Sequence, residues 1–423
     1  MHHFTRKRDA YAVYLLSEGA AALFYSLIFT VSSLYQVLVV GLDPLQLVLV
    51  GTTLEVVAFC FEVPTGIVAD LFSRRLSILI GFLLTGLAYI VQGLVPTFGA
   101  VLLSQVIWGL GITFTSGATQ AWISDEVGEA RAGQAFVRAA QVGPIGALVG
   151  IGLSVALGSV HVRLPIVIGG GLFVALAGTL ALIMPETGFK PAPRTERTTL
   201  RSMGSTFREG LGLVRTRGIL LTFLGIAAIT GLFSEGFDRL WTPHVIENLS
   251  LSAAGGFQPV VWFGAFNVIG IFLGLGATEL VRRRIDVQSD RAVGRALLTF
   301  SGVMSAALVA FALAPGFAIG MAAYFVATTL RHVSGPLEQA WLNRHVDSSV
   351  RATMFSMAGQ VNAIGQIAGG PGIGLIGARV SLRAALTASG LLLAPITLLY
   401  ARALRQSEER EPVPVVESAE LPA

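Results

Sequence analysis

Charged side chains interrupt several long apolar runs of this sequence, and they are the residues most able to do chemistry. They are Glu18, Glu55, Glu235, Asp238, Arg239 and Arg331. A charge at the centre of an apolar helix costs about 2.5–3.5 kcal/mol on insertion scales, so it normally faces a cavity or a partner. We therefore predict that these residues bind substrate or protons, with structural capping or ion pairing to basic neighbours as the alternative.

Glu55 shares one helical face with Glu62, Gly66 and Asp70, because these residues are spaced by seven, four and four positions. Glu55 lies deepest, roughly 20 Å from Asp70 at the rise of a helix. A buried carboxylate of this kind is a candidate proton carrier. The alternative is a structural hydrogen bond to a facing helix, and Glu62 is expected to be structural.

Asp238 and Arg239 are adjacent, so on a helix they point about 100° apart and need separate partners. Arg239 can pair with Glu235 four residues earlier, which leaves Asp238 for substrate, a proton or Arg331. We expect Arg331 either to contact an anionic group of the substrate or to hold a carboxylate from the run containing Glu235. Trp241 is a candidate for substrate contact, with packing or interfacial anchoring as the alternative.

The composition identifies the elements that must position these residues. Of 423 residues, 53% are hydrophobic and 13% are charged, where a soluble domain carries about 25% charged residues. A membrane span needs about 20 apolar residues, and this chain contains one such run after another. Since the runs lack the alternation of a barrel strand, we predict an all-α membrane protein.

Breaking the chain at charge clusters and at Pro/Gly turns predicts twelve transmembrane helices. They lie near 10–40, 45–69, 76–96, 98–126, 132–158, 162–184, 218–246, 254–281, 293–313, 315–342, 352–378 and 382–402. A polar connection divides them six and six, and its composition predicts a cytoplasmic linker ending in an amphipathic surface helix. The predicted units are an N-terminal bundle (1–184), the linker (185–217), a C-terminal bundle (218–404) and a disordered cytoplasmic tail (405–423).

Basic residues are distributed unequally between the two sides of these spans. One side collects those of the N-terminus, the linker and 282–284, whereas the other has only Arg163, Arg379 and Arg383. Cytoplasmic loops are enriched in Lys and Arg, so both termini are predicted to be cytoplasmic. This bias accounts for the net charge of +4, and a nucleic-acid partner is not expected.

Short matches between the halves predict an internal duplication. Placing Gln120-Ala121-Trp122 on Gln339-Ala340-Trp341 also places Gly146 and Gly150 on Gly365 and Gly369. With nearly the same offset, Ser17-Glu18-Gly19 of the first span matches Ser234-Glu235-Gly236 of the seventh. We therefore predict two bundles related by a pseudo-two-fold axis, with a central cavity that opens alternately to each side by rocking.

The connection between the second and third spans carries a family motif. Gly66-Ile-Val-Ala-Asp70-Leu-Phe-Ser-Arg74-Arg75 resembles the major facilitator superfamily (MFS) signature G-x-x-x-D-x-x-x-R-R/K. Gly66 is expected to let helices approach closely, Asp70 to accept hydrogen bonds from a helix N-terminus, and both arginines to stay at headgroup level. The resemblance implies the MFS fold and a latch that holds the two halves in one state.

Further segments are similar to bacterial family members that export drugs or small solutes, which implies a bacterial inner membrane. They are Glu62-Val-Pro64-Thr-Gly66, Ser116-Gly117-Ala-Thr-Gln120-Ala-Trp122 and Glu235-Gly236-Phe-Asp238-Arg239-Leu. The stretch Gly276-Ala-Thr-Glu279-Leu-Val-Arg282-Arg283-Arg284 resembles a degenerate second copy of the signature. Proton-coupled exporters carry R-x-x-Q-G in the fourth span, and here Gln105-Val-Ile-Trp108-Gly109 lacks the arginine.

The sequence contains no P-loop lysine motif, HExxH, GxSxG or metal-spaced His/Cys set, so neither catalytic nor metal-binding residues are predicted. We expect a secondary transporter, not an enzyme, that exports a hydrophobic or amphipathic drug-like molecule by alternating access, as a monomer surrounded by lipid. A proton gradient is the expected energy source, in an antiporter without other cofactors. The alternatives are an uptake carrier, a lipid translocator, or a membrane receptor or scaffold without turnover.

Overall fold

The computed structural model describes residues 9–191, 218–251, 255–346 and 351–408, and these contain thirteen α-helices. The first half comprises α1 (Ala10–Leu38), α2 (Pro44–Leu71), α3 (Arg74–Leu94), α4 (Phe98–Thr115), α5 (Ala118–Val127), α6 (Glu129–Val160) and α7 (Leu164–Ile183). The second comprises α9 (Gly218–Glu247), α10 (Pro259–Arg284), α11 (Asp290–Leu313), α12 (Phe317–His345), α13 (Arg351–Arg379) and α14 (Leu382–Glu408). Because α4 and α5 form one span, the twelve predicted spans are confirmed.

Ten of these spans are long and apolar enough to cross a membrane. The other two are α12, which carries Arg331 and His332, and α13. The fourth span is broken at Gly117, whose φ of 70° is a conformation that a side chain would strain. The break reorients α5 relative to α4, where the sequence predicted one continuous helix.

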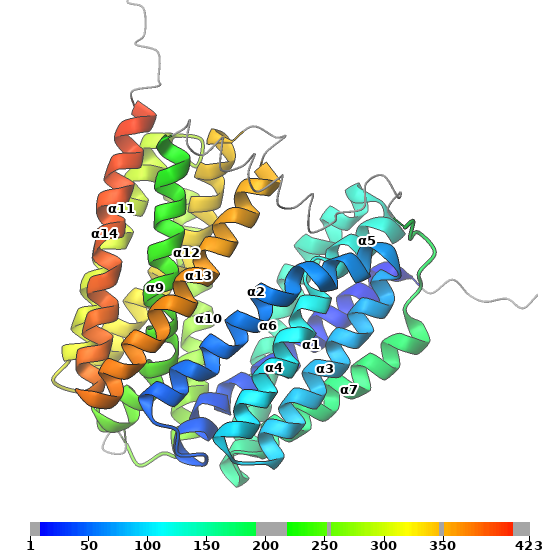
Figure 1. Ribbon diagram of the computed structural model, residues 1–423, viewed down its shortest axis with the longest axis horizontal. Helices are drawn as coiled ribbons and strands as arrows, with labels where there is room; N and C mark the ends of the chain where they lie inside the picture. Colours follow the sequence, from blue (N-terminus) through cyan, green and yellow to red (C-terminus); the bar gives the residue numbers. More distant parts are fainter. Residues whose placement is uncertain (1–8, 192–217, 252–254, 347–350, 409–423) are drawn as a thin grey trace, which may run out of the picture.

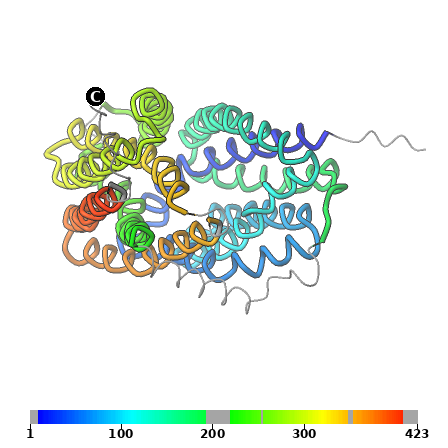
Figure 2. The backbone as a smooth tube through the Cα atoms, turned by 90° about the horizontal axis from the view of Figure 1, so that it is seen from above, coloured from blue at the N-terminus to red at the C-terminus, as the bar shows by residue number. Residues whose placement is uncertain are grey.

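The two halves lean together at one end and diverge toward the other (Figure 1). They meet where α2 begins and α13 ends, and where α6 ends and α10 begins. Gly374 of α13 packs on Val48 of α2, and Gly158 of α6 packs on Val260 of α10. The view from above also shows two separate bundles (Figure 2). The space between them therefore opens where α2 ends and α13 begins, on the side of the arginine-rich connections.

Backbone contacts confirm the predicted alignment of the fifth spans, α6 and α13. A Cβ built on Gly146 of α6 would lie 2.5 Å from the Gly19 carbonyl oxygen of α1, and one on Gly365 of α13 would lie 2.5 Å from that of Ala228 of α9. The same contact recurs one turn along, at Gly150 and Gly369. Two helices that touch backbone to backbone tolerate no side chain between them. The pairs α1–α6 and α9–α13 are thus equivalent.

The predicted alignment of the first spans, which placed Glu18 on Glu235, is wrong. Gly19 of α1 and Ala228 of α9 make the same contact with their fifth spans, so these two residues correspond to each other. Glu18 therefore corresponds to Ala227. By the same register, Glu235 corresponds to Ser26.

The caps of the third spans correct the predicted second copy of the signature. Ser73 caps α3 by accepting a hydrogen bond from the Leu76 amide at 2.9 Å, and Ser289 caps α11 in the same way from Ala292 at 3.2 Å. Counting back from these two caps, the counterpart of Asp70 is Asp286. Glu279 lies two turns before this position, where it pairs with arginines of its own helix.

The helices differ from the predicted unit boundaries at two places. Residues 185–191, assigned to the linker, lie against α5, and α14 continues past the predicted boundary to Glu408. Residues 192–217, which include the amphipathic helix predicted at the end of the linker, and the tail beyond 408 lie outside the described residues.

Candidate functional site

An ion pair joins two helices of the second half. Arg331 of α12 donates to Asp238 of α9 with both terminal nitrogens, at 2.6 and 2.9 Å. The side chains are 35% and 43% exposed. The Arg331 guanidinium also lies 5.5 Å from the centre of the Phe233 ring. Of the two alternatives open for Arg331, the structure shows the interhelical pair, and its partial exposure leaves the pair accessible to a solute.

A second ion pair is formed by Glu235 and Arg239 within α9. Arg239 Nε donates to Glu235 Oε1 at 2.8 Å. Glu235 is buried, with 3% of its surface exposed. The i,i+4 pairing predicted from the sequence is therefore present, and Glu235 is engaged by an arginine in this conformation.

Glu55 and Glu62 of α2 line a cavity of about 270 Å³ between α2 and α13, which we call the acidic cleft. Its other walls are Ala58, Phe59, Phe355, Ser356, Gly359, Gln360, Asn362, Ala363 and Gln366. Neither the Glu55 nor the Glu62 carboxylate forms a hydrogen bond or ion pair with another described residue. The expectation that Glu55 and Glu62 share one face of α2 is confirmed. The polar side chains opposite them in the cleft include the amides of Gln360, Asn362 and Gln366.

The two halves face each other along two seams, one where α2 lies next to α13 and the other where α6 lies next to α10. An aromatic cleft of about 400 Å³ lies on the second seam, between α6, α9, α10 and α12. It is lined by Pro144, Trp241, Phe266, Asn267, Gly270, Ile271, Gly274, Leu275, Tyr324, Phe325, Thr328, Thr329 and His332. Trp241 stacks on Tyr324 with ring centres 4.7 Å apart and packs on Phe263 at 5.1 Å. Trp241 thus packs against other rings and also lines a cavity, and its contact with a substrate stays a prediction.

The two clefts occupy equivalent places in the two halves. Counting back from the caps of the third spans relates Glu55 to Ile271 and Phe59 to Leu275, and all four line their respective clefts. The fifth spans contribute Pro144 to one cleft and its counterpart Ala363 to the other. The carboxylate of Glu55 therefore stands where the second half has the apolar side chain of Ile271.

Glu18 lies apart from both clefts. It is partly exposed on α1, and its carboxylate forms no hydrogen bond or ion pair with another described residue. The structure does not bring it together with Glu55 or Glu235.

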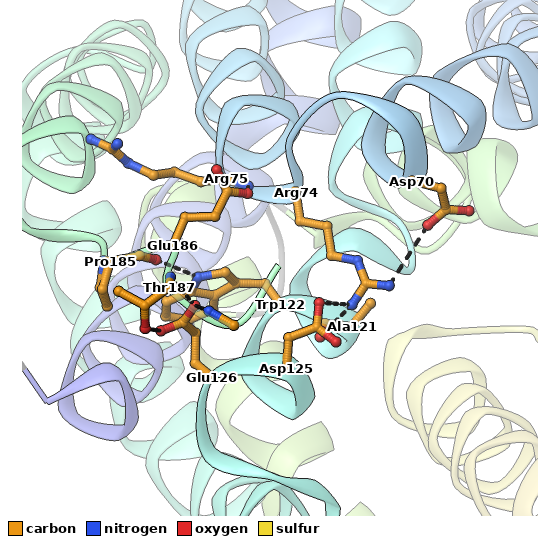
Figure 3. A network of polar contacts seen from close by, with 11 residues as sticks. Asp70, Arg74, Arg75, Ala121, Trp122, Asp125, Glu126, Pro185, Glu186 and Thr187 are labelled. Carbon is orange, nitrogen blue, oxygen red and sulfur yellow. Dashed lines mark hydrogen bonds and ion pairs between the residues drawn. The ribbon is translucent and has the colours of Figure 1, made fainter. Parts of the chain in front are cut away.

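The residues of the family signature form a polar network with α5 and with the segment that follows α7 (Figure 3). Arg74 donates to the Ala121 carbonyl oxygen at 2.8 Å and pairs with Asp125, while Asp70 lies 3.9 Å away. The Arg75 amide donates to Glu186 at 2.9 Å, and the Arg75 side chain bonds to the Ala181 carbonyl oxygen. All these partners belong to the first half. In this conformation these contacts of the signature residues stay within the first half, and their role as a latch between the halves stays a prediction.

The explanation given for Gly66 does not hold in this structure. A Cβ on Gly66 would meet none of the described atoms within 4 Å, so no helix approaches closely there. Asp70 is likewise about half exposed, and its contact among the described residues is with Arg74. Both residues face the divergent end of the molecule, where the halves stand apart.

The second half contains the same contact with the charges reversed. Asp290 begins α11, as Arg74 begins α3, and it pairs with Arg344 and with His345 at 3.1 Å near the end of α12. Because Trp122 aligns with Trp341, the counterpart of Asp125 is Arg344. Each half thus fastens its third span to its fourth by an ion pair of opposite polarity.

Two polar sites were not predicted from the sequence. Glu338 of α12 accepts a hydrogen bond from the Tyr400 hydroxyl and lines a cavity of about 290 Å³ that shares Phe355, Gly359 and Asn362 with the acidic cleft. The feature of the sequence that could have identified Glu338 as a site residue is its isolated carboxylate, two helical turns after Arg331. Gln105, at the position of the missing arginine, is buried and donates to Gln92 at 3.4 Å and to Ser104 at 3.2 Å.

Two equivalent six-helix halves with ionisable side chains along their seams are the architecture of a membrane transporter. The family description "Major Facilitator Superfamily" matches residues 13–331, and the chain belongs to this family. It is therefore a multi-pass membrane transporter of the MFS type and not an enzyme.

Similar proteins agree with this assignment. The "Uncharacterized MFS-type transporter YxaM" of Bacillus subtilis (strain 168) is 22% identical over 358 residues, which are 85% of this chain and 87% of that protein. The crystal structure of nucleoside transporter NupG has a TM-score of 0.70 at 14% identity and covers 95% of this chain and 99% of its own. An inward-facing, unoccupied bacterial homolog of the human lysosomal transporter Spinster has a TM-score of 0.67 at 16% identity, covering 95% and 97%. At these identities the solved structures establish the fold alone.

Proposed function

We propose that this transporter exports a hydrophobic or amphipathic small molecule by alternating access, coupled to protons. The observation that carries the proposal is the aromatic cleft on the seam between the halves. A site at such a seam is exposed to one side and then the other as the halves rock. Four aromatic side chains offer flat apolar surface there: Trp241, Phe266, Tyr324 and Phe325.

Polar groups in the same cleft favour an amphipathic over a purely apolar substrate. Asn267, Thr329 and His332 line the cavity, and the amide of Asn267 donates to the Phe263 carbonyl oxygen at 2.8 Å. The Asn267 carbonyl oxygen is then available as an acceptor. A few polar groups within an apolar pocket fix a ligand's orientation while aromatic contacts supply affinity.

The acidic cleft supports proton coupling. Glu55 lies among amides and aromatic rings, and no arginine in the described part of the chain forms an ion pair with it, so its protonation breaks no such pair. The protonated and ionised forms of such a carboxylate favour different arrangements of the helices around it. Glu55 is therefore our candidate proton carrier, and Glu18 is a second one outside the clefts.

The asymmetry of basic residues supports a bacterial inner-membrane location with both termini in the cytoplasm. In this orientation the divergent end faces the cytoplasm, which is the side from which an exporter loads. Each chain contains both seams, which supports function as a monomer surrounded by lipid, with the small-molecule substrate as its ligand.

The proposal can be tested in proteoliposomes that contain an internal pH dye. Gradients of lipophilic cations and of neutral aromatic compounds are imposed on the wild-type protein and on Glu18→Gln, Glu55→Gln and Glu235→Gln. We expect solute movement to drive a counterflow of protons that Glu55→Gln abolishes. Solute movement without proton flux would leave a uniporter, and accumulation in the direction of the proton gradient would indicate uptake.

A further inference from the structure

Gly51 of α2 lies directly against the Glu235–Arg239 pair of α9. A Cβ built on Gly51 would overlap Glu235 Oε1 and Arg239 Nε. The ion pair belongs to the second half and Gly51 to the first. The pair therefore occupies the space that any larger residue at position 51 would fill.

A third helix closes this contact. Gly370 of α13 also has no side chain, and a Cβ there would lie 3.0 Å from Thr52 Oγ1 and 3.1 Å from Glu235 Cγ. The Thr52 hydroxyl is buried without a hydrogen-bond partner among the described residues. The backbones of α2 and α13 thus approach the Glu235 side chain from two directions.

A carboxylate of the first half lies on the same face of α2 as this contact. Glu55 follows Gly51 by one helical turn, so the two residues face the same direction. Arg239 is bonded to Glu235 at 2.8 Å, and Gly51 leaves the room that this pair fills against α2.

The opposite seam has no equivalent of this arrangement. The counterparts of Glu235 and Arg239 are Ser26 and Thr30, and the Thr30 hydroxyl donates to the Ser26 carbonyl oxygen at 2.7 Å. The counterpart of Gly51 is Asn267, whose side chain bonds to its own helix. The ion pair is therefore a property of the α2–α9 contact and not of the repeated fold.

We propose that the Glu235–Arg239 pair, seated on Gly51, is a lock between the halves that stabilises this conformation. Alternating access requires α2 and α9 to separate at this end, which uncovers the pair. A change that weakens the contact should shift the population toward the other conformation. The lock concerns the conformational equilibrium itself, whatever solute is carried and whichever ion drives it.

The test measures the accessibility of introduced cysteines in the full-length, detergent-solubilised protein, after Cys60→Ser removes the native thiol. Val260→Cys reports on the closed end, where Val260 is 3% exposed against α6. Ser356→Cys reports on the open acidic cleft. We expect Gly51→Ala to raise the rate of maleimide labelling at Val260→Cys about tenfold, a typical effect of overpacking, and to slow labelling at Ser356→Cys.

Gly372→Ala is the matched control, since it adds the same methyl group on α13 where a Cβ would meet none of the described atoms within 4 Å. It should leave both rates within about twofold of the parent. Unchanged rates in a folded Gly51→Ala protein, or an equal shift in Gly372→Ala, would overturn the proposal. If Gly51→Ala does not fold, Gly370→Ala decides, because its added methyl group would press on Glu235 Cγ from α13 at 3.1 Å. A rise of about threefold at Val260→Cys supports the lock, and no change refutes it.

Discussion

The aromatic and acidic clefts occupy equivalent positions in the two halves, yet they offer a solute opposite chemistry. Ile271 and Leu275 line the first, where Glu55 and Phe59 line the second. The backbone repeat fixes where a cavity forms, while single side chains decide what the cavity attracts. A duplicated fold can therefore divide substrate binding and ion coupling between its two seams without changing its helices.

The largest effect should come from making the acidic cleft resemble the aromatic one. Glu55→Ile places the second half's residue in the first half, and we expect proton flux to fall by about a hundredfold or more, as for loss of a proton-transfer group. The measurement is the internal pH of proteoliposomes during solute efflux. Glu62→Gln is the control on the same face, and a similar loss there would assign the coupling to the cleft as a whole.

A smaller effect is expected from removing the stacked wall of the aromatic cleft. Trp241→Ala should raise the concentration for half-maximal transport roughly tenfold, because an aromatic contact of this kind contributes about 1–1.5 kcal/mol. Proton coupling per transported solute should stay unchanged. Phe272→Ala, on the same seam helix α10 but 60% exposed and outside the cleft, is the matched control. Equal effects of the two substitutions would remove Trp241 from the substrate site.

The Asp238–Arg331 pair should contribute less, since both side chains are partly exposed. We expect Asp238→Asn to lower the free energy of unfolding by about 1 kcal/mol, the upper end for solvent-accessible pairs. A double-mutant cycle with Arg331→Gln, followed by thermal unfolding in detergent, measures the coupling. A coupling energy near zero would mean that the two groups are held apart by substrate or water in solution.

The smallest effect concerns the ion pairs at the divergent end. Exchanging the charges in the first half, as Arg74→Asp with Asp125→Arg, gives it the polarity of Asp290 and Arg344. Each single change should cost about 0.5–1 kcal/mol of stability, and the exchange should recover most of it. Thermal unfolding of the three variants is the measurement. Failure of the exchange would assign Arg74 a role that polarity alone does not supply, for example its bond to the Ala121 carbonyl oxygen.

Much of the fold could be predicted from sequence because hydropathy determines which segments enter the membrane. The Glu235–Arg239 pair could also be predicted, since both residues are on one helix and their spacing defines their contact. The choice of Arg331 as the partner of Asp238 required the packing of α9 against α12. The two clefts and the fit at Gly51 depend on distances between helices far apart in sequence, which no local pattern encodes.

The wrong alignment of the first spans has a physical cause. The connection 39–43 between α1 and α2 is shorter than the connection 248–258 between α9 and α10. The offset between equivalent residues therefore changes along the chain, and a single shift cannot hold for all spans. Glu18 matched Glu235 only because both follow a serine and precede a glycine, and their surroundings differ.

The reversed ion pairs between the third and fourth spans bear on how the chain assembles in the membrane. Helices of similar length and hydropathy are inserted one after another. Their hydropathy alone does not determine which of the two fourth spans a third span packs against. Docked against the wrong one, α3 would bring Arg74 toward Arg344, and α11 would bring Asp290 toward Asp125. Like charges repel, so the exchanged arrangement is penalised at both places at once. The opposite polarity of the two pairs therefore favours the packing of each third span against the fourth span of its own half.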